Sequence, residues 1–87
     1  MNKKFWVYII QSEKGNRTYT GHTNDVDRRL NDHNRGKMSS TRPHRPLKLI
    51  YTEEFSSRSD AMIREKFLKS GKGREVRKEL IKQYENK

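Results

Sequence analysis

The chain of 87 residues is long enough for one domain and too short for two independent hydrophobic cores, so we expect a single domain over residues 1–87. Hydrophobic residues make up 29% and charged residues 37%, which favours a thin mixed α/β layer with a highly charged surface. Three Phe, one Trp and four Tyr argue against a disordered chain. The absence of cysteine excludes a disulfide framework and a thiolate metal site.

The net charge of +10 is spread along the chain. Residues 1–45 hold ten Lys/Arg and four Asp/Glu (net +6), and residues 46–87 hold eleven and seven (net +4). Such a field attracts polyanions, so nucleic acid is the expected partner, with an anionic membrane surface or an acidic protein as alternatives. The longest apolar run, FWVYII, is far shorter than the roughly 20 residues that span a bilayer. No small-residue cleavage site follows it, so we expect a cytoplasmic protein.

The first elements in chain order are predicted strands. Residues 4–11 (KFWVYIIQ) carry apolar side chains on both faces, which is typical of a central strand. A turn around Gly15 and the β-rich residues 17–21 (RTYTG) predict an antiparallel hairpin. Residues 47–55 (LKLIYTEEF) predict a third strand after the first helix.

The first helix is expected between the hairpin and the third strand. Thr23 or Asn24 can cap its N-terminus, and Asn24 with Asp27 resembles a capping box. Gly36 is a suitable C-terminal stop. Residues 37–46 (KMSSTRPHRP) contain two prolines and predict an irregular loop.

Two more helices follow the third strand. A capping box formed by Ser57 and Asp60 predicts a helix that ends near residues 68 and 69, and residues 74–87 predict a last helix. The order is therefore ββαβαα. It predicts an α/β fold of the α+β kind, with a three-stranded antiparallel or mixed sheet flanked by helices.

Tyr8 and Tyr19 lie on the two strands of the predicted hairpin. A four-residue turn over residues 12–15 pairs them directly, and a four-residue turn over residues 13–16 makes them diagonal neighbours. Both turns place the two phenols on one face of the sheet, whereas a five-residue turn would separate them. We predict an even turn and a shared face. The alternative is that both are ordinary half-buried strand aromatics.

Arg29 and His33 share the inner stripe of the predicted first helix with Val26 and Leu30. At 100° per residue, all four fall within an arc of about 100°. Burying an unpaired arginine is unfavourable. Either its guanidinium reaches out to solvent, or this face opens into a cleft. Two phenols on the adjacent hairpin favour the cleft.

These residues stand in an order that resembles the GIY-YIG nuclease superfamily, over about Lys4 to Leu80. Residues 6–8 (WVY) correspond to the first signature triplet and residues 19–21 (YTG) to the second. Residues 41–69 (TRPHRPLKLIYTEEFSSRSDAMIREKFLK) closely resemble the small stand-alone branch of that superfamily. The resemblance implies a GIY-YIG-like fold.

The resemblance also implies site residues. Tyr19 would be the general base or orient the attacking water, and Tyr8 would hold the water or phosphate by a hydrogen bond. Arg29, ten residues after the second tyrosine, would favour a phenolate and bind the scissile phosphate. His33 would relay a proton, and Glu65 in the second helix would bind a divalent metal ion. Without the resemblance, the plainer expectation for Glu65 is an ion pair on the surface of its helix, with Lys69 as the partner four residues on.

Further positions are expected to bind nucleic acid. His22 stands where some relatives carry lysine and would contact a phosphate. The loop after the first helix adds five basic or imidazole side chains that would contact phosphates without reading sequence, unless the loop is simply solvated: Arg35, Lys37, Arg42, His44 and Arg45.

The sequence departs from the resemblance at one place. Many family members carry a supporting asparagine beyond the glutamate, where this chain has residues 70–77 (SGKGREVR). We expect a monomeric, Mg²⁺- or Mn²⁺-dependent endonuclease that cuts DNA in a structure-selective or nonspecific way. The alternatives are a catalytically weak DNA- or RNA-binding module of the same fold, and a small RNA-associated basic protein that ignores metal.

Overall fold

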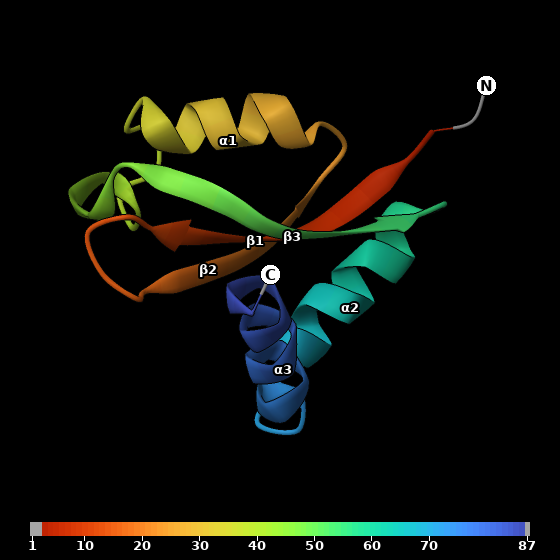
Figure 1. Cartoon of the computed structure of the whole chain (residues 1–87). Coiled ribbons are helices and arrows are strands. Elements are labelled where there is room, and N and C mark those ends of the chain that lie inside the picture. The colour runs from red at the N-terminus through yellow and green to blue at the C-terminus, as the bar shows by residue number, and fades with distance from the viewer. Residues whose placement is uncertain (1–2, 87) are drawn as a thin grey trace.

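The computed structural model describes residues 3–86 and shows three strands and three helices in the predicted order ββαβαα (Figure 1). The strands are β1 (Phe5–Ser12), β2 (Thr18–Thr23) and β3 (Leu47–Phe55). The helices are α1 (Val26–Asn34), α2 (Arg58–Lys69) and α3 (Arg74–Glu85). A short 3₁₀ turn, Arg42–His44, interrupts the loop before β3. Among the helices described, none is long and apolar enough to cross a bilayer.

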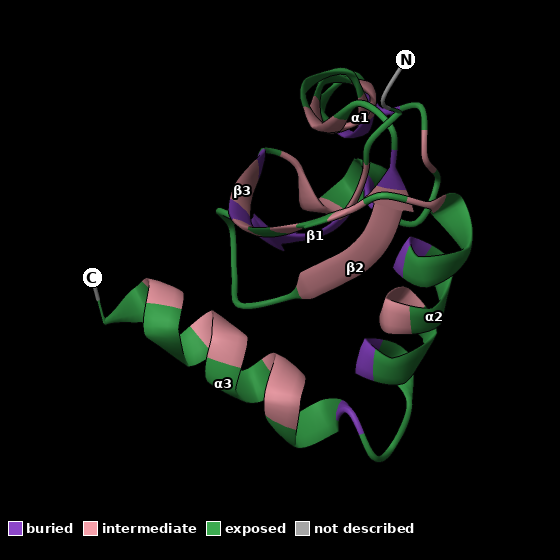
Figure 2. Cartoon of the chain, turned by 90° about the vertical axis from the view of Figure 1, so that its right-hand side faces the viewer, coloured by how far each residue is buried: buried purple, intermediate pink, exposed green. Residues whose placement is uncertain are grey.

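Strand β1 lies at the centre of an antiparallel sheet with the order β2-β1-β3, as its two apolar faces predict. Helix α1 covers one face, and α2 and α3 lie against the other (Figure 1). On the α1 side the core is built around Tyr8 and Ile10, and on the α2 side around Val7, Ala61 and Leu68. Figure 2 shows the same arrangement, with buried residues on β1 and on the inner side of α2.

The first hairpin fixes the positions of the two tyrosines. Ile10 is paired with Tyr19 and Tyr8 with Gly21, so Tyr8 and Tyr19 are diagonal neighbours on one face. The predicted shared face is confirmed. Of the two turns considered, the one over residues 13–16 forms, because the Ser12 N–H donates to the Arg17 carbonyl at 3.0 Å and closes it. The two tyrosines are therefore not paired directly: the partner of Tyr8 is Gly21, which lies two residues after Tyr19.

Helix α1 begins later than the predicted caps, Thr23 or Asn24, would place it. Asp25 is the N-cap, and its carboxylate accepts a hydrogen bond from the backbone N–H of Arg28 at 3.0 Å. The two residues expected to cap the helix form other hydrogen bonds. The Thr23 hydroxyl accepts from the Asp25 N–H at 3.1 Å, and the Asn24 side chain accepts from the Arg28 guanidinium at 2.9 Å. The predicted capping box of Asn24 and Asp27 is wrong, because Asp25 has the better reach to the first turn.

The other predicted helix ends are confirmed, except that the last helix ends earlier than predicted. Gly36 follows α1 with φ of +82°, a left-handed conformation that suits glycine. The Ser57 hydroxyl accepts from the Asp60 N–H at 3.1 Å, and α2 ends at Lys69. The last helix was predicted over residues 74–87; it begins at Arg74 and ends at Glu85, and its predicted last residue lies outside the described part of the chain.

Candidate active site

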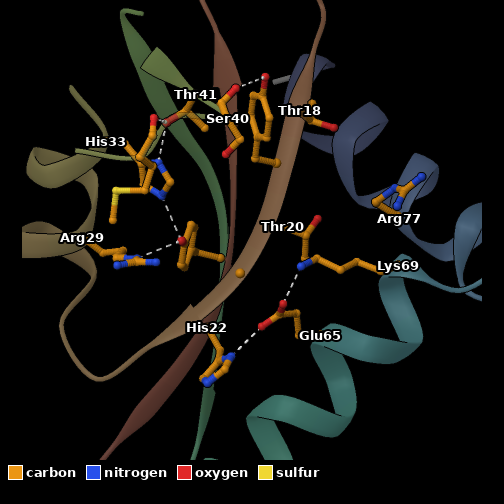
Figure 3. Close-up of a pocket in the computed structure, with 14 residues that line it drawn as sticks. Thr18, Thr20, His22, Arg29, His33, Ser40, Thr41, Glu65, Lys69 and Arg77 are labelled. Atoms are coloured by element: carbon orange, nitrogen blue, oxygen red, sulfur yellow. Dashed lines mark hydrogen bonds and ion pairs between the residues drawn. The ribbon is translucent and has the colours of Figure 1, made fainter. Parts of the chain in front are cut away.

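A pocket of about 510 Å³ lies over β2, which is an edge strand of the sheet. Helix α1 and the loop after it form one wall, and α2 with the start of α3 forms the other (Figure 3). The pocket is lined by all the residues with a predicted catalytic or metal role and by one with a predicted phosphate contact, His22. These residues are Tyr8, Tyr19, His22, Arg29, His33 and Glu65.

The pocket reaches both faces of the sheet because side chains alternate along β2. Tyr19 and Gly21 lie on the α1 face, together with Tyr8. His22 is paired with Val7 and lies on the α2 face, where it meets Glu65 (Figure 3). Since no further strand within residues 3–86 covers β2, the two sets of side chains share one opening at its edge.

A chain of hydrogen bonds links α1 to the floor of the pocket. The Tyr8 hydroxyl lies 3.0 Å from His33 Nε2, and His33 Nδ1 lies 2.9 Å from the Thr41 hydroxyl. Arg29 donates from Nε to the Tyr8 oxygen at 3.4 Å. Tyr8, His33 and Thr41 are all buried, with 4%, 5% and 1% of their surfaces exposed. Burial at this level makes an unpaired polar atom unfavourable, so the chain must be satisfied internally.

One assignment of protons gives every donor in this chain an acceptor. The Thr41 hydroxyl donates to the Met38 carbonyl at 3.5 Å and accepts from His33 Nδ1–H. His33 Nε2 is then unprotonated and accepts the Tyr8 hydroxyl proton, while the Tyr8 oxygen accepts from Arg29. The tyrosine therefore has a hydrogen-bond donor on one side and an imidazole base on the other.

Burial lowers the pKa of His33 below its usual value of 6.5, and the nearby positive charge of Arg29 lowers it further. The carboxylate of Asp32 acts in the opposite direction but does not outweigh them. His33 is therefore a neutral imidazole at pH 7. Its free lone pair faces Tyr8 and can take up a proton.

Replacing Thr41 with valine should lower the free energy of unfolding by about 1–3 kcal/mol, because His33 Nδ1–H loses its buried acceptor. Threonine and valine have nearly the same shape, so the loss reports the hydroxyl. Urea unfolding measures it, with Thr41→Ser as the control that retains the hydroxyl and should stay closer to wild type. Equal stability of the valine variant and wild type would contradict the hydrogen-bond assignment.

Gly21 allows the tyrosine ring to lie against the backbone of β2. A Cβ atom at this position would lie 2.6 Å from the Tyr8 hydroxyl oxygen and 2.7 Å from the ring carbon that carries it. Any larger residue would push the phenol away from His33 and Arg29. The tyrosine of the first triplet can therefore take this position only because the second triplet has a glycine opposite it.

Tyr19 has a different environment from Tyr8. Its hydroxyl donates to the Ser40 carbonyl at 3.2 Å, and its ring lies 6.1 Å from that of His44. A backbone carbonyl holds the phenol in place but cannot take its proton. The Tyr19 oxygen retains lone pairs that can accept a hydrogen bond from water in the pocket.

Glu65 forms the α2 side of the pocket. Its Oε1 accepts from His22 Nδ1 and its Oε2 from Lys69 Nζ, each at 2.5 Å (Figure 3). Burial raises the pKa of this carboxyl, but hydrogen bonds from Lys69 and His22 outweigh that effect and hold the pKa below its usual value. Glu65 is therefore ionised. The ion pair with Lys69, the plainer expectation, is confirmed, and the same carboxylate lines the pocket, on the flank of α2 that faces β2.

The donor set for a metal ion is small. Within residues 3–86 no three His, Cys, Asp or Glu side chains are grouped as a metal centre would require. Of the described residues that line the pocket, Glu65 is the only carboxylate. An ionised carboxylate is nevertheless sufficient for Mg²⁺, which commonly takes one or two carboxylates and completes its shell with water and phosphate oxygens. The residues present therefore fit an ion that binds together with a phosphate.

Residues 4–85 match the GIY-YIG catalytic domain. The chain belongs to the GIY-YIG family. This nuclease family is named for the two triplets, which in this chain are WVY and YTG on β1 and β2. The family assignment agrees with the pocket, which is lined by the tyrosine of the first triplet and by all three residues of the second.

Small UPF0213 relatives match most of the chain. The UPF0213 protein SAG0778 of Streptococcus agalactiae is 43% identical over 82 residues, which cover 93% of this chain and 91% of the relative. The UPF0213 protein SH2523 of Staphylococcus haemolyticus is 46% identical over 68 residues, 77% of this chain and 82% of the relative. The solution NMR structure of the UPF0213 protein BH0048 from Bacillus halodurans superposes with a TM-score of 0.52 at 38% identity, covering 88% of this chain and 84% of that one.

The basic side chains of the loop after α1 lie outside the pocket. Arg42 donates from Nε to the Gly36 carbonyl at 2.7 Å, and Arg45 donates from Nε to the Arg42 carbonyl at 2.9 Å. Lys37 forms an ion pair with Asp32 at 3.4 Å. None of the loop residues expected to contact phosphates lines the pocket: Arg35, Lys37, Arg42, His44 and Arg45. Their binding role stays a prediction, and two of them also hold the loop in its shape.

Several residues that line the pocket were not placed at the site by sequence reasoning, among them Thr41, Lys69 and Arg77. The spacing of Lys69, four residues after Glu65, could have indicated it. Arg77 belongs to the segment that stands in place of the GIY-YIG asparagine, and it also donates to the Leu68 carbonyl at the end of α2, at 3.0 Å. No local pattern identifies Thr41 or Arg77, because Thr41 lies in an irregular loop and Arg77 reaches the pocket through the packing of α3 against the end of α2.

Proposed function

We propose that this GIY-YIG protein is a metal-dependent endonuclease that hydrolyses phosphodiester bonds in DNA, in a structure-selective or nonspecific way. The observation that carries the proposal is the convergence of Tyr8, His33, Arg29 and Glu65 on one pocket at the edge of β2. The net charge of +10 supports an anionic polymer as substrate. Membership of the GIY-YIG family supports nuclease chemistry.

Two cationic side chains on opposite walls suit a phosphate between them. Arg29 stands on α1 and Lys69 on α2, and both line the pocket. Phosphodiester hydrolysis adds negative charge to the phosphate oxygens in the transition state, and fixed positive charges stabilise it. Arg29 is in the better position to do so, since its Nε is already oriented toward the reacting region by Tyr8.

The hydrogen-bond chain supports Tyr8 as the group that takes the proton from water. Its own proton passes to the free Nε2 of neutral His33, and Arg29 stabilises the phenolate that forms. Tyr19, which the family resemblance makes the base or the orienting group, is better suited to the second role. Its proton is directed to the Ser40 carbonyl, and its oxygen can accept from the attacking water.

Glu65 would hold the divalent ion, with Mg²⁺ or Mn²⁺ as the candidates. When bound, the ion would neutralise charge on the phosphate and assist the departing oxygen. His22 and Lys69 keep the carboxylate ionised and oriented in its absence. A cation at Glu65 would compete with the ammonium of Lys69, which could then turn toward the phosphate.

A second candidate function is a DNA- or RNA-binding module with little catalysis. Two observations favour it: both Glu65 oxygens are engaged by His22 and Lys69, and the segment that carries Arg77 replaces the supporting asparagine. Such a module would use the same pocket to hold a phosphate. It would bind equally well with and without metal.

A nicking assay distinguishes the two candidates. Wild type is incubated with supercoiled plasmid and with labelled branched DNA, in Mg²⁺, Mn²⁺ or EDTA. Glu65→Gln and Tyr8→Phe should each lower the nicking rate by about 100-fold or more, and Tyr19→Phe should lower it less. Tyr51→Phe is the matched control, since the Tyr51 hydroxyl binds Glu53 on β3, away from the pocket. An inert wild type that binds DNA as its variants do would establish the binding module instead.

A further inference from the structure

Two large apolar side chains are exposed on α2 beside the candidate active site. Met62 is 48% exposed and Ile63 is 66% exposed. Together with Ser59 and Lys66 on the same helix they line a mostly apolar groove, which also includes His22 and Glu65. We call these six residues the α2 groove. Figure 2 shows that the outer side of α2 is exposed along its length.

The α2 groove is not a loosely packed part of the core. Ser59, Met62, Ile63 and Lys66 follow the i, i+3, i+4, i+7 spacing of a single helix face. The core face of the same helix carries Ala61 and Leu68, both of which are fully buried. Neighbouring apolar side chains that stay exposed on a folded domain indicate a surface that binds something.

Continuity with the pocket suggests what the groove binds. His22 and Glu65 line both the pocket and the α2 groove, so the two cavities meet at these side chains. A phosphodiester in the pocket carries a nucleoside on each side. The nucleoside on the α2 side leaves the pocket past His22 and Glu65 and meets Met62 and Ile63.

The chemistry of the groove matches an unpaired nucleobase. Apolar side chains pack against the flat faces of a base whatever its identity, and Lys66 adds positive charge for the next phosphate. A base inside a duplex is stacked and paired, so it cannot reach a helix surface. An apolar peptide or a second protein copy would cover Met62 and Ile63 too, but neither explains why the groove opens into a pocket lined by cationic side chains.

We infer that the α2 groove holds an unpaired nucleobase next to the scissile phosphate, so that the preferred substrate is DNA with an extruded or single-stranded nucleotide at the cut. This inference rests on the proposed function for its cleavage step. The binding step stands without it. The proposed function leaves open whether cutting is structure-selective or nonspecific, and this inference favours structure-selective cutting.

Binding in EDTA tests the inference without cleavage. Three fluorescent duplexes of equal length are titrated: one fully paired, one with a single bulged nucleotide, and one with an abasic residue at the bulge. Wild type should bind the bulged duplex about fivefold more tightly than either of the others. The double variant Met62→Ser/Ile63→Ser should bind all three alike. Phe67→Ser is the matched control, because Phe67 is 37% exposed on the same helix but does not line the groove, and it should keep the preference.

The outcomes separate the two proposals. Wild type that binds all three duplexes equally, or a double variant that still prefers the bulged base, would overturn the inference. A bulge preference lost only in the double variant supports it even if the nicking assay is negative, and that combination would leave a binding module for unpaired bases. Thermal unfolding of each variant confirms that the comparison is made between folded proteins.

Discussion

Arg29→Met is expected to lower the nicking rate by about 100-fold or more, with little change in stability. Arg29 lines the pocket on α1 and donates to the Tyr8 hydroxyl at 3.4 Å, so its removal takes away both a phosphate contact and the charge that stabilises a Tyr8 phenolate. Methionine retains most of the length of the aliphatic stem and its packing against α1. Single-turnover nicking of supercoiled plasmid at saturating protein measures the effect on the chemical step.

Arg28→Met is the matched control for the loss of positive charge. Arg28 is the adjacent residue of α1, but it is exposed and its guanidinium donates to Asn24 at 2.9 Å, outside the pocket. Both variants change the net charge by the same amount, so both should weaken nonspecific DNA binding similarly. A similar nicking rate in the two variants would show that Arg29 contributes only to the general field.

Gly73→Ala is expected to cause the largest loss of stability, about 3 kcal/mol or more. Gly73 is buried at the start of α3, and a Cβ there would lie 1.8 Å from the Phe67 carbonyl oxygen. That oxygen also accepts from the backbone and hydroxyl of Ser70, at 3.0 and 2.6 Å, so it cannot move without opening the end of α2. Urea unfolding followed by circular dichroism measures the loss.

Gly71→Ala is the control for the same turn. A Cβ at Gly71 would meet nothing within 4 Å, and its φ is not in the left-handed region. Alanine there should change the free energy of unfolding by no more than about 0.5 kcal/mol. If both alanine variants had the same free energy of unfolding as wild type, α3 could not be packed as closely on the end of α2 as the structure shows. That packing also places Arg77 at the pocket, so nicking by Gly73→Ala should fall even at temperatures where it is folded.

The family supplies the two motifs, and the fold explains why they are neighbours on the central strand β1 and the edge strand β2. Tyr8 needs a neighbour with no side chain, and Gly21 provides it in the paired position. His22, one residue later, is directed to the opposite face and meets Glu65. Two consecutive positions of the edge strand therefore contact Tyr8 on one face of the sheet and Glu65 of α2 on the other.

Much of this arrangement could be predicted from local patterns. The apolar faces of residues 4–11 determined that β1 is central, and the even turn determined that the two tyrosines share a face. Ser57 and Gly36 specified helix ends through contacts with neighbours three or four residues away. The helical spacing of Arg29 and His33 indicated a cleft, and both line the pocket. These features depend on periodicity and on hydrogen bonds between residues close in the chain, so they can be predicted from short stretches of sequence.

Other features were decided only when distant segments packed together. His22 reaches Glu65 across 43 residues, and Thr41 reaches His33 from a loop with no regular pattern. Such contacts depend on how the layers pack, and no short stretch of sequence contains that information. The sequence by itself indicated six side chains that line the pocket, and the tertiary structure decided which partner each of them contacts.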